Sequence, residues 1–243
     1  MPASFQELDH QQTPLGELVL RRRQSVSLPD TVVYEVKLNG EFLMSSLVNA
    51  SEKALADLAL SLRPRQPCNV LIGGLGLGCT AEAALAHDQV QRVDVVEYLD
   101  PVIAWHRKRL VPAAATLIDD PRCTLIHGDF FDRVGTRPAA GQPRYDAILV
   151  DIDHSPRSLL HARHGRFYAS EGVEHLAMHL RRGGVFALWS ADPPPDSLLK
   201  RLGRVFACVR SHPVRFRNPL LHEWELNTVV VARLEAEYSP LNG

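Results

Sequence analysis

Short apolar runs alternate with longer helix-forming segments from residue 68 to the end of the chain. This order of strand and helix predicts a parallel sheet with right-handed crossovers. The last two apolar runs are joined only by R-F-R-N-P-L-L-H-E-W, so we expect a long hairpin whose final strand is antiparallel. The expected strands cover residues 69–72, 92–97, 122–126, 145–151, 185–189, 206–214 and 226–234.

The first 66 residues have a different pattern. Residues 31–38 alternate between apolar and polar, and Asn39-Gly40 separates them from a second short run at 41–44, which predicts a hairpin with a type I′ turn. Residues 16–20 are a further expected strand. Ser51 is the expected N-cap of a helix over 52–62, before two prolines that we take as a domain boundary. Gly183-Gly184 is expected to cap a later helix over 173–182.

Residues 69–78 read N-V-L-I-G-G-L-G-L-G, an apolar strand that leads into a glycine-rich turn, and the next strand ends at Glu97. Backbone N–H groups in such a turn can approach a ligand, and an acid about 20 residues later can hold a ribose diol. We therefore expect an adenosine-bearing ligand, with Gly74, Gly76 and Gly78 in the turn. Glycines also serve close packing of helix on sheet, and G-x-G-x-x-A at 76–81 fits an NAD fingerprint as well.

Carboxylates follow the third and fourth strands of the expected sheet. Asp129 could accept from an adenine amine with Phe130 near the ring, or it could cap the next turn. Asp151, Asp153 and His154 come after the fourth strand, where ligands of open parallel sheets bind. A carboxylate there can take a proton from an incoming amine, and His154 is the alternative base. The alternative for these residues is an Asx-turn with an exposed histidine.

Two further features lie near this edge of the sheet. Trp189 ends the fifth strand, where an indole can line a pocket or belong to the core. The stretch H-A-R-H-G-R-F-Y at 161–168 is a candidate lid. Its histidines have no acidic partner at ligand spacing, so we expect no metal site.

The composition restricts the class of partner. The chain has 243 residues and a formal net charge of -1, so no net basic field favours nucleic acid. We interpret Arg21-Arg22-Arg23 as a solvated strand end. Because no segment approaches 18 uninterrupted apolar residues and the first residues do not resemble a signal peptide, we expect no membrane partner and a cytoplasmic location.

A set of motifs in order resembles the spermidine synthase family of polyamine aminopropyltransferases over about residues 33–231. The motifs are G-G-L-G-L-G, V-V-E-Y-L-D-P-V-I, D-D-P-R, H-G-D-F-F, Y-D-A-I-L-V-D, F-Y-A-S-E-G-V and R-R-G-G-V-F. The resemblance implies an α/β, Rossmann-type class I methyltransferase fold, with a mostly parallel seven-stranded sheet whose last strand is antiparallel. It also implies a small β-rich N-terminal domain with a linking helix at 1–66 and a nucleoside-binding catalytic domain at 67–243.

Residue roles follow from the same resemblance, position by position. Glycines 74, 76 and 78 would contact the nucleoside, Glu97 the ribose and Asp129 the adenine. Asp151 matches the aspartate that activates the amine. The resemblance argues against NAD and implies a homodimer formed through the N-terminal β domain and neighbouring helices.

The chain departs from the family pattern at three places. Gly76 replaces the aspartate of G-G-G-D-G-G that holds the donor's aminopropyl nitrogen, and His154 replaces the second polyamine-binding aspartate of D-S-S-D. The Y-x-E segment, which supplies an aromatic wall and an acid, appears near Ser51-Glu52-Lys53 without its tyrosine. Each lost charge-assisted contact costs roughly 1.5 to 3 kcal/mol, so we do not expect ordinary spermidine synthesis.

We therefore expect a transferase that binds S-adenosylmethionine or its decarboxylated form as donor and alkylates a small-molecule nucleophile, such as an amine. Methyl transfer is slightly favoured because the aminopropyl anchor is absent, although Ile72 stands where methyltransferases usually carry an acid. The alternatives are an aminopropyltransferase of polyamine biosynthesis, a non-catalytic nucleoside-binding regulator and, third, an NAD-dependent oxidoreductase.

Overall fold

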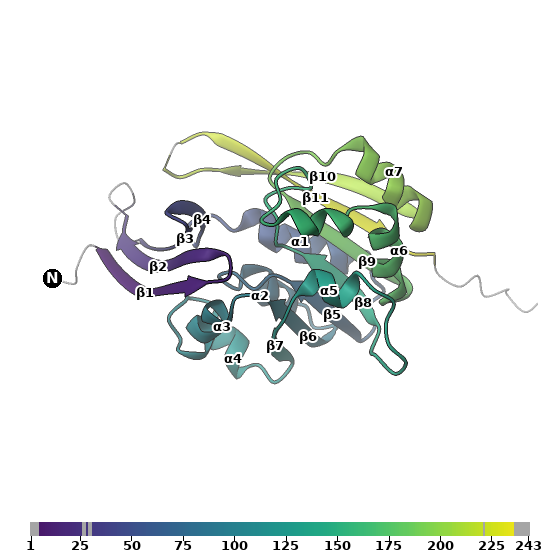
Figure 1. The fold of residues 1–243 in the computed structure, drawn as a ribbon, viewed down its shortest axis with the longest axis horizontal. Helices are drawn as coiled ribbons and strands as arrows, with labels where there is room; N and C mark the ends of the chain where they lie inside the picture. The colour runs from purple at the N-terminus through teal and green to yellow at the C-terminus, as the bar shows by residue number, and fades with distance from the viewer. Residues whose placement is uncertain (1–4, 26–27, 29–30, 221, 236–243) are drawn as a thin grey trace, which may run out of the picture.

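Two β-sheets and the helices around the larger one make up the protein (Figure 1). The computed structural model describes residues 5–25, 28, 31–220 and 222–235. The four-stranded sheet has the order β1-β2-β3-β4, and the seven-stranded sheet has the order β10-β11-β9-β8-β5-β6-β7. No helix among the described residues is both long and apolar enough to cross a membrane.

The N-terminal sheet is antiparallel throughout and consists of β1 (Phe5–Thr13), β2 (Gly16–Gln24), β3 (Val32–Leu38) and β4 (Glu41–Ser45). The predicted hairpin is confirmed: Asn39 and Gly40 have φ values of 52° and 79°, as a type I′ turn requires. Strand β1 was not predicted, because its mostly polar residues form an exposed edge with little alternation. Trp105 fastens this strand to the larger sheet's helices, since its Nε1 donates to Asp9 Oδ2 at 2.6 Å.

Helix α1 (Ala50–Ser61) connects the two sheets. The prediction that Ser51 is its N-cap was wrong. Asn49 holds that position, and Ser51 lies in the first turn, where it is 2% exposed. The helix packs on α2, β9 and β11, and one continuous apolar core includes Leu18 from the N-terminal sheet and Leu55 from α1. The division of the chain at residue 66 stays a prediction. The outer ends of the two predicted domains, residues 1–4 and 236–243, lie outside the described residues.

The larger sheet confirms the predicted fold class. All seven expected strands are present, and β11 runs antiparallel to both β9 and β10, whereas the neighbouring pairs among β5 to β9 are parallel. The strands are β5 (Cys68–Gly73), β6 (Val90–Glu97), β7 (Cys123–His127), β8 (Tyr145–Val150), β9 (Leu180–Ser190), β10 (Cys208–Arg217) and β11 (Trp224–Arg233). The helices are α2 (Cys79–Leu85), α3 (Asp100–Arg107), α4 (Ala114–Asp119), α5 (Phe130–Val134), α6 (Ser170–Met178), α7 (Asp196–Val205) and the 3₁₀ helix η1 (Ala162–Arg166).

The expected helix cap at Gly183-Gly184 was wrong. Helix α6 ends at Met178, and the chain enters β9 at Leu180. Gly183 has a φ of +67° at a place where the register of β9 against β8 shifts. The two glycines therefore allow an irregularity inside the strand.

Candidate functional site

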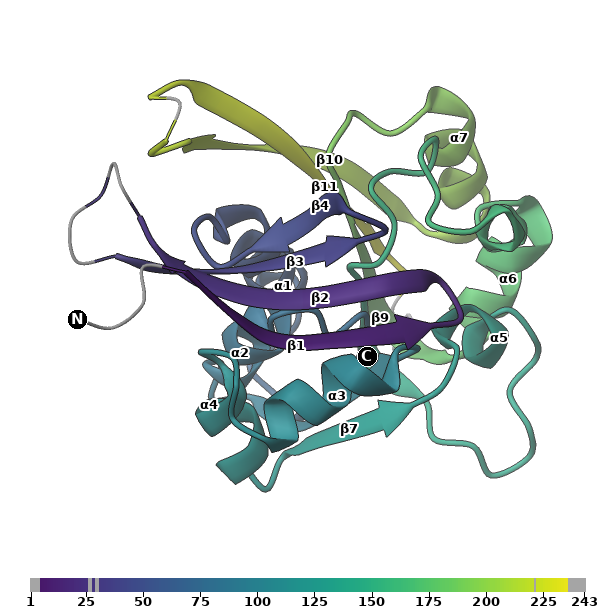
Figure 2. The same ribbon diagram turned by 60° about the vertical axis from the view of Figure 1, so that its left-hand side comes forward.

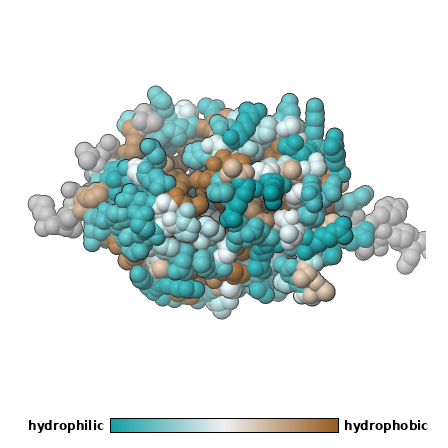
Figure 3. Space-filling model, in the orientation of Figure 1, coloured by the Kyte–Doolittle hydropathy of each residue, from teal (hydrophilic) through white to brown (hydrophobic). Residues whose placement is uncertain are grey.

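A cavity of about 480 Å³ lies at the carboxyl ends of β5, β6 and β8. The N-terminal sheet closes one side of it, and the hairpin β10–β11 contributes another wall. Figure 3 shows apolar residues gathered around a hollow on one face of the molecule. The volume is in the range of small-molecule sites, and the position is where open α/β sheets bind ligands.

The glycine turn forms the floor of this cavity. Gly74 has a φ of +92°, and a Cβ atom there would lie 2.1 Å from the Asp151 carbonyl oxygen. Glu97 ties the turn to the start of α3, because its carboxylate accepts from Leu75 N at 2.9 Å and Leu99 N at 2.8 Å. Burial raises the pKa of Glu97, and these backbone donors oppose that rise. Gly74, Gly76 and Glu97 thus line one cavity, as an adenosine site requires.

Gly78, the third glycine predicted to contact the nucleoside, lies outside the cavity. It is not among the residues that line the cavity, and a Cβ atom there would lie 2.9 Å from Ala113 Cβ and from the ring of His106. The absence of a side chain at Gly78 allows α2 to pack closely against α3 and α4. His106, which the sequence analysis missed, is fully buried and lies with Nε2 3.0 Å from the Gly76 carbonyl oxygen. This contact supports the glycine turn on the side of α3. A single histidine within a helix gives no sequence signal for that role.

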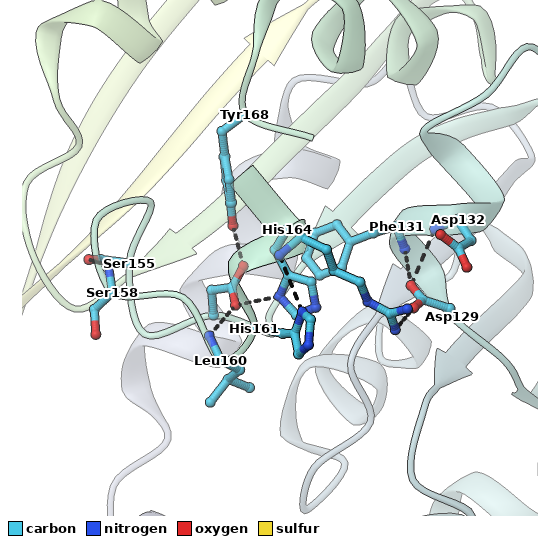
Figure 4. Close-up of polar contacts among 11 residues, drawn as sticks. Asp129, Phe131, Asp132, Ser155, Ser158, Leu160, His161, His164 and Tyr168 are labelled. Atoms are coloured by element: carbon cyan, nitrogen blue, oxygen red, sulfur yellow. Dashed lines mark hydrogen bonds and ion pairs between the residues drawn. The ribbon is translucent and has the colours of Figure 1, made fainter. Parts of the chain in front are cut away.

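Asp129 and Phe130 lie where β7 leads into α5. Asp129 caps this helix, since its Oδ1 accepts from Phe131 N at 2.8 Å and from Asp132 N at 3.2 Å (Figure 4). Its Oδ2 forms an ion pair with Arg163. The ring of Phe130 packs beneath the first glycine of the turn and is 2% exposed. The structure therefore shows the capping role of Asp129, and the adenine role stays a prediction.

Asp151 shares the cavity with a second carboxylate, that of Glu52. Asp151 Oδ2 accepts from Thr80 Oγ1 at 2.7 Å. Burial and the negative charge of Glu52 together raise the pKa of Asp151 to about 7, although the Thr80 hydrogen bond opposes them. Burial also raises the pKa of Glu52, whose carboxylate accepts from Ser51 Oγ at 2.8 Å. A pair of acids in this state can bind an ammonium group and take a proton from it.

The sequence analysis had counted the segment around Glu52 as a departure from the family pattern. The structure shows that the acid lies in the cavity and that the aromatic residue of the pattern is absent, with Ala50 and Ser51 before it. An acid in the first turn of a helix is favoured by the helix dipole alone, so its presence in the sequence does not point to a binding site. Only the crossing of α1 over the cavity reveals its position.

Asp153 is buried, with 2% of its surface exposed, and holds its own chain segment together. Its carboxylate accepts from Leu160 N at 2.8 Å and from Tyr168 OH at 3.0 Å, and it lies 2.8 Å from His164 Nδ1 (Figure 4). These contacts stabilise residues 153–168, which include the predicted lid. This geometry suits a positioning residue better than the catalytic role expected for Asp153.

His154 is exposed and lines the cavity. Its ring meets that of Trp189 edge-on, with centroids 6.4 Å apart. Trp189 lines the cavity, so its wall role is supported, and His161, Arg163 and His164 of the lid segment line it as well. Among the described residues, no group of three or more His, Cys, Asp or Glu side chains could hold a metal ion.

Known proteins resemble the chain in both sequence and fold. A polyamine aminopropyltransferase 2 from Pseudomonas aeruginosa is 29% identical over 203 residues, covering 79% of this chain and 55% of that protein. A putrescine N-methyltransferase 2 from Nicotiana attenuata is 40% identical over 85 residues, covering 35% of this chain and 22% of that protein. The structure of a spermidine synthase in complex with the transition-state analogue AdoDATO superposes with a TM-score of 0.73 at 20% identity, covering 95% of this chain and 74% of that one.

These matches differ in what they establish. The solved structure, at 20% identity, shows the fold. The chain spans about half the length of the aminopropyltransferase relative and less of the N-methyltransferase. The model of the spermine/spermidine synthase domain matches residues 49–195, which include the glycine turn, Glu97, Asp129 and Asp151. Because that match covers more than half of the chain, the protein belongs to the spermine/spermidine synthase domain family.

Proposed function

We propose that this protein transfers an alkyl group from an S-adenosyl sulfonium donor to a small amine. The pair Asp151 and Glu52 carries the proposal, because both carboxylates line the cavity beside the glycine turn and the charge of one raises the pKa of the other. The turn and Glu97 would hold the adenosine part of the donor, since Gly74, Gly76 and Glu97 line the same cavity at the carboxyl end of the sheet. Neither S-adenosylmethionine nor its decarboxylated form requires a metal for this transfer.

The proposed mechanism depends mainly on positioning. An acceptor ammonium would be attracted by both carboxylates and would lose a proton to Asp151, whose pKa of about 7 suits a base at neutral pH. The free amine nitrogen would then attack the carbon on sulfur in line with the departing thioether. The bond from carbon to sulfur breaks as the bond from carbon to nitrogen forms, and the sulfonium becomes neutral. Asp153 would act indirectly by holding residues 153–168.

We propose aminopropyl as the transferred group, with decarboxylated S-adenosylmethionine as donor. Membership of the family and the 29% identity to a polyamine aminopropyltransferase support this choice over the methyl transfer that the sequence analysis slightly favoured. A polyamine-type acceptor is part of the same proposal. A homodimer and a cytoplasmic location also stay proposals, supported by the resemblance and by the composition.

Methyl transfer is a second candidate because of one observation. Gly76 stands where the resemblance places the aspartate that holds the donor's aminopropyl nitrogen, and a Cβ atom there would lie 2.9 Å from Met44 Sδ. A thioether over this position offers no charge to an ammonium group. The match to a putrescine N-methyltransferase over 85 residues agrees with this alternative.

Side-by-side calorimetric titration with S-adenosylmethionine, its decarboxylated form and methylthioadenosine tests the proposal, followed by turnover with a panel of amines. Tighter binding of the decarboxylated donor together with an aminopropylated product is the expected result. Preference for S-adenosylmethionine with a methylated product would establish the second candidate. Nucleoside binding without any turnover would indicate a regulator, and binding of NAD without S-adenosylhomocysteine would indicate an oxidoreductase.

A further inference from the structure

The cavity continues past Asp151 along the inner face of β11. Asn227 Oδ1 lies 3.1 Å from Ser51 Oγ, and the Glu52 carboxylate lies 2.8 Å from the same hydroxyl oxygen. Glu225 lies two residues earlier on the same strand, so its side chain points to the same face about 7 Å away. Asn227 and Glu225 both line the cavity. A third acid therefore follows the Asp151 and Glu52 pair along one wall.

The hairpin β10–β11 extends past β4 (Figure 2). Because side chains alternate along a strand, its outward-facing residues differ from those that face the cavity. Trp224 and Leu226 are 65% and 47% exposed on the outer face, and the Arg215 guanidinium stacks over the Trp224 ring at 5.2 Å. This arginine thus lies on the face opposite Glu225. The acid brings its negative charge to the cavity side.

Glu225 differs in this respect from Glu35, another acid that lines the cavity. Arg21 and Arg23 each approach the Glu35 carboxylate to 2.7 Å and compensate its charge, so this arginine run is partly paired and not simply solvated. Within the described ranges, no lysine, arginine or histidine forms an ion pair with Glu225. Its charge remains available to a cationic ligand.

The hairpin also orients the Glu225 carboxylate. Asn218 Nδ2 donates to Glu225 Oε1 at 2.7 Å. Asn218 is itself held in the hairpin end, where its N–H donates to the Glu223 carbonyl oxygen at 2.8 Å and its Oδ1 accepts from Leu220 N at 2.9 Å. A carboxylate can accept several donors, so one amide contact leaves capacity for an ammonium group. Phe216, opposite Glu225 on β10, supplies an apolar wall beside it.

We propose that Glu225 binds the distal ammonium group of the acceptor, so that the preferred acceptor is a diamine or a longer polyamine. This role rests on the proposed function: the reacting nitrogen lies at Asp151 and Glu52, and the methylene chain runs along the wall toward Glu225. Fixed carboxylates at both ends match the charges of such a molecule. A monoamine lacks the second charge and gains nothing from Glu225.

Steady-state kinetics with the donor that the wild type uses test this role. The acceptors are 1,4-diaminobutane, 1,5-diaminopentane and 1-aminobutane. We expect Glu225→Gln to raise the KM of at least one diamine by roughly tenfold or more while kcat stays within about threefold and the monoamine KM is unchanged. The diamine KM of Glu225→Asp should lie between those of the wild type and Glu225→Gln. Glu223→Gln is the matched control, because this exposed acid lies on the same hairpin outside the cavity.

The outcomes separate the two proposals. Wild-type turnover combined with unchanged diamine KM values in Glu225→Gln rejects the role of Glu225 and leaves the proposed function intact. An equal loss for diamine and monoamine rejects it as well, since the variant would then act through general damage. A wild type that alkylates no amine with either donor overturns the proposed function and the role of Glu225 together. Thermal melting of each variant identifies one that fails to fold, and Glu225→Asp then provides the test.

Discussion

Asp151 and Glu97 lie in one cavity, and the proposed reaction gives them different tasks. Asp151→Asn keeps the shape of the side chain and removes the base, so we expect turnover to fall by about 10²-fold or more while the Kd of S-adenosylhomocysteine stays within a few-fold. Glu97→Ala removes the proposed ribose ligand and the acceptor for Leu75 N, so nucleoside binding itself should weaken by roughly tenfold or more. Calorimetry and single-turnover rates measure the two effects.

Asp132→Asn is the control for this comparison, because Asp132 is exposed and lies outside the cavity. It should behave as the wild type in both measurements. Equal loss of nucleoside binding in the Asp151 and Glu97 variants would show that their roles had been misassigned.

If Asp151 is the base of the proposed reaction, its raised pKa sets the expected pH dependence. A base must be deprotonated, so kcat/KM should rise with pH through about 7. Thr80→Val removes the hydrogen bond that stabilises the ionised form, which raises the pKa and moves this rise to higher pH. Glu52→Gln removes a like charge, which lowers the pKa of Asp151 and moves the rise to lower pH. Profiles of kcat/KM against pH check both directions.

The neighbours of Asp151 allow this interpretation to be tested. Cys79 also lies near it on α2, but burial raises the pKa of its thiol to about 11, so it stays neutral throughout the profile. Shifts of the two variants in the same direction would mean that another group controls the rise. Their opposite signs distinguish the effect from a general loss of activity.

At the scale of elements, the segment from β8 to α6 depends on Asp153. Its carboxylate contacts Leu160 N, His164 Nδ1 and Tyr168 OH. Replacing the charged carboxylate by a neutral amide weakens each of these hydrogen bonds. We expect Asp153→Asn to increase hydrogen exchange across residues 155–168 several-fold. Turnover should fall less than in Asp151→Asn. Exchange measured by mass spectrometry, with Asp132→Asn as control, tests this, and a loss of turnover equal to that of Asp151→Asn without faster exchange would instead make Asp153 catalytic.

The sequence predicted those elements whose signals are local. The strand before the glycine turn, the type I′ turn at Asn39-Gly40 and the antiparallel β11 followed from apolar runs, turn residues and a linker too short for a helix. Strand β1 was not predicted because an exposed edge strand needs little apolar alternation. The cap at Gly183 was misplaced because a glycine inside a strand irregularity and one at a helix end look alike in sequence.

The candidate site was predictable only where a residue follows its strand directly. Glu97, Asp129 and Asp151 end or follow strands that meet at one edge, and topology brings them together. Glu52 and Glu225 reach the same cavity from α1 and β11. Their positions depend on long-range packing of elements far apart in the chain, which no local pattern records.

At the scale of the whole molecule, the N-terminal sheet meets the glycine turn over the proposed donor site. Met44 on β4 lies over Gly76, while the Trp105 hydrogen bond to Asp9 fastens the same sheet to α3. In the proposed function, the choice of donor would therefore depend on a contact between the two sheets. A carboxylate at position 76 could bind an aminopropyl ammonium if Met44 were removed.

The double variant Met44→Ala with Gly76→Asp tests this dependence. Gly76 has a φ of +48°, a conformation that Asp tolerates better than most residues, and the smaller alanine removes the sulfur atom that would lie 2.9 Å from the new Cβ. A charge-assisted contact worth roughly 1.5 to 3 kcal/mol should raise the affinity for decarboxylated S-adenosylmethionine relative to S-adenosylmethionine by about 10-fold to 100-fold. Calorimetric titration with both donors measures the ratio, and Met44→Ala alone, which adds no charge, should leave it nearly unchanged. If the ratio stays at the wild-type value in a double variant that binds methylthioadenosine normally, the donor's distal group lies elsewhere in the cavity, and the contact between Met44 and Gly76 has no part in selecting it.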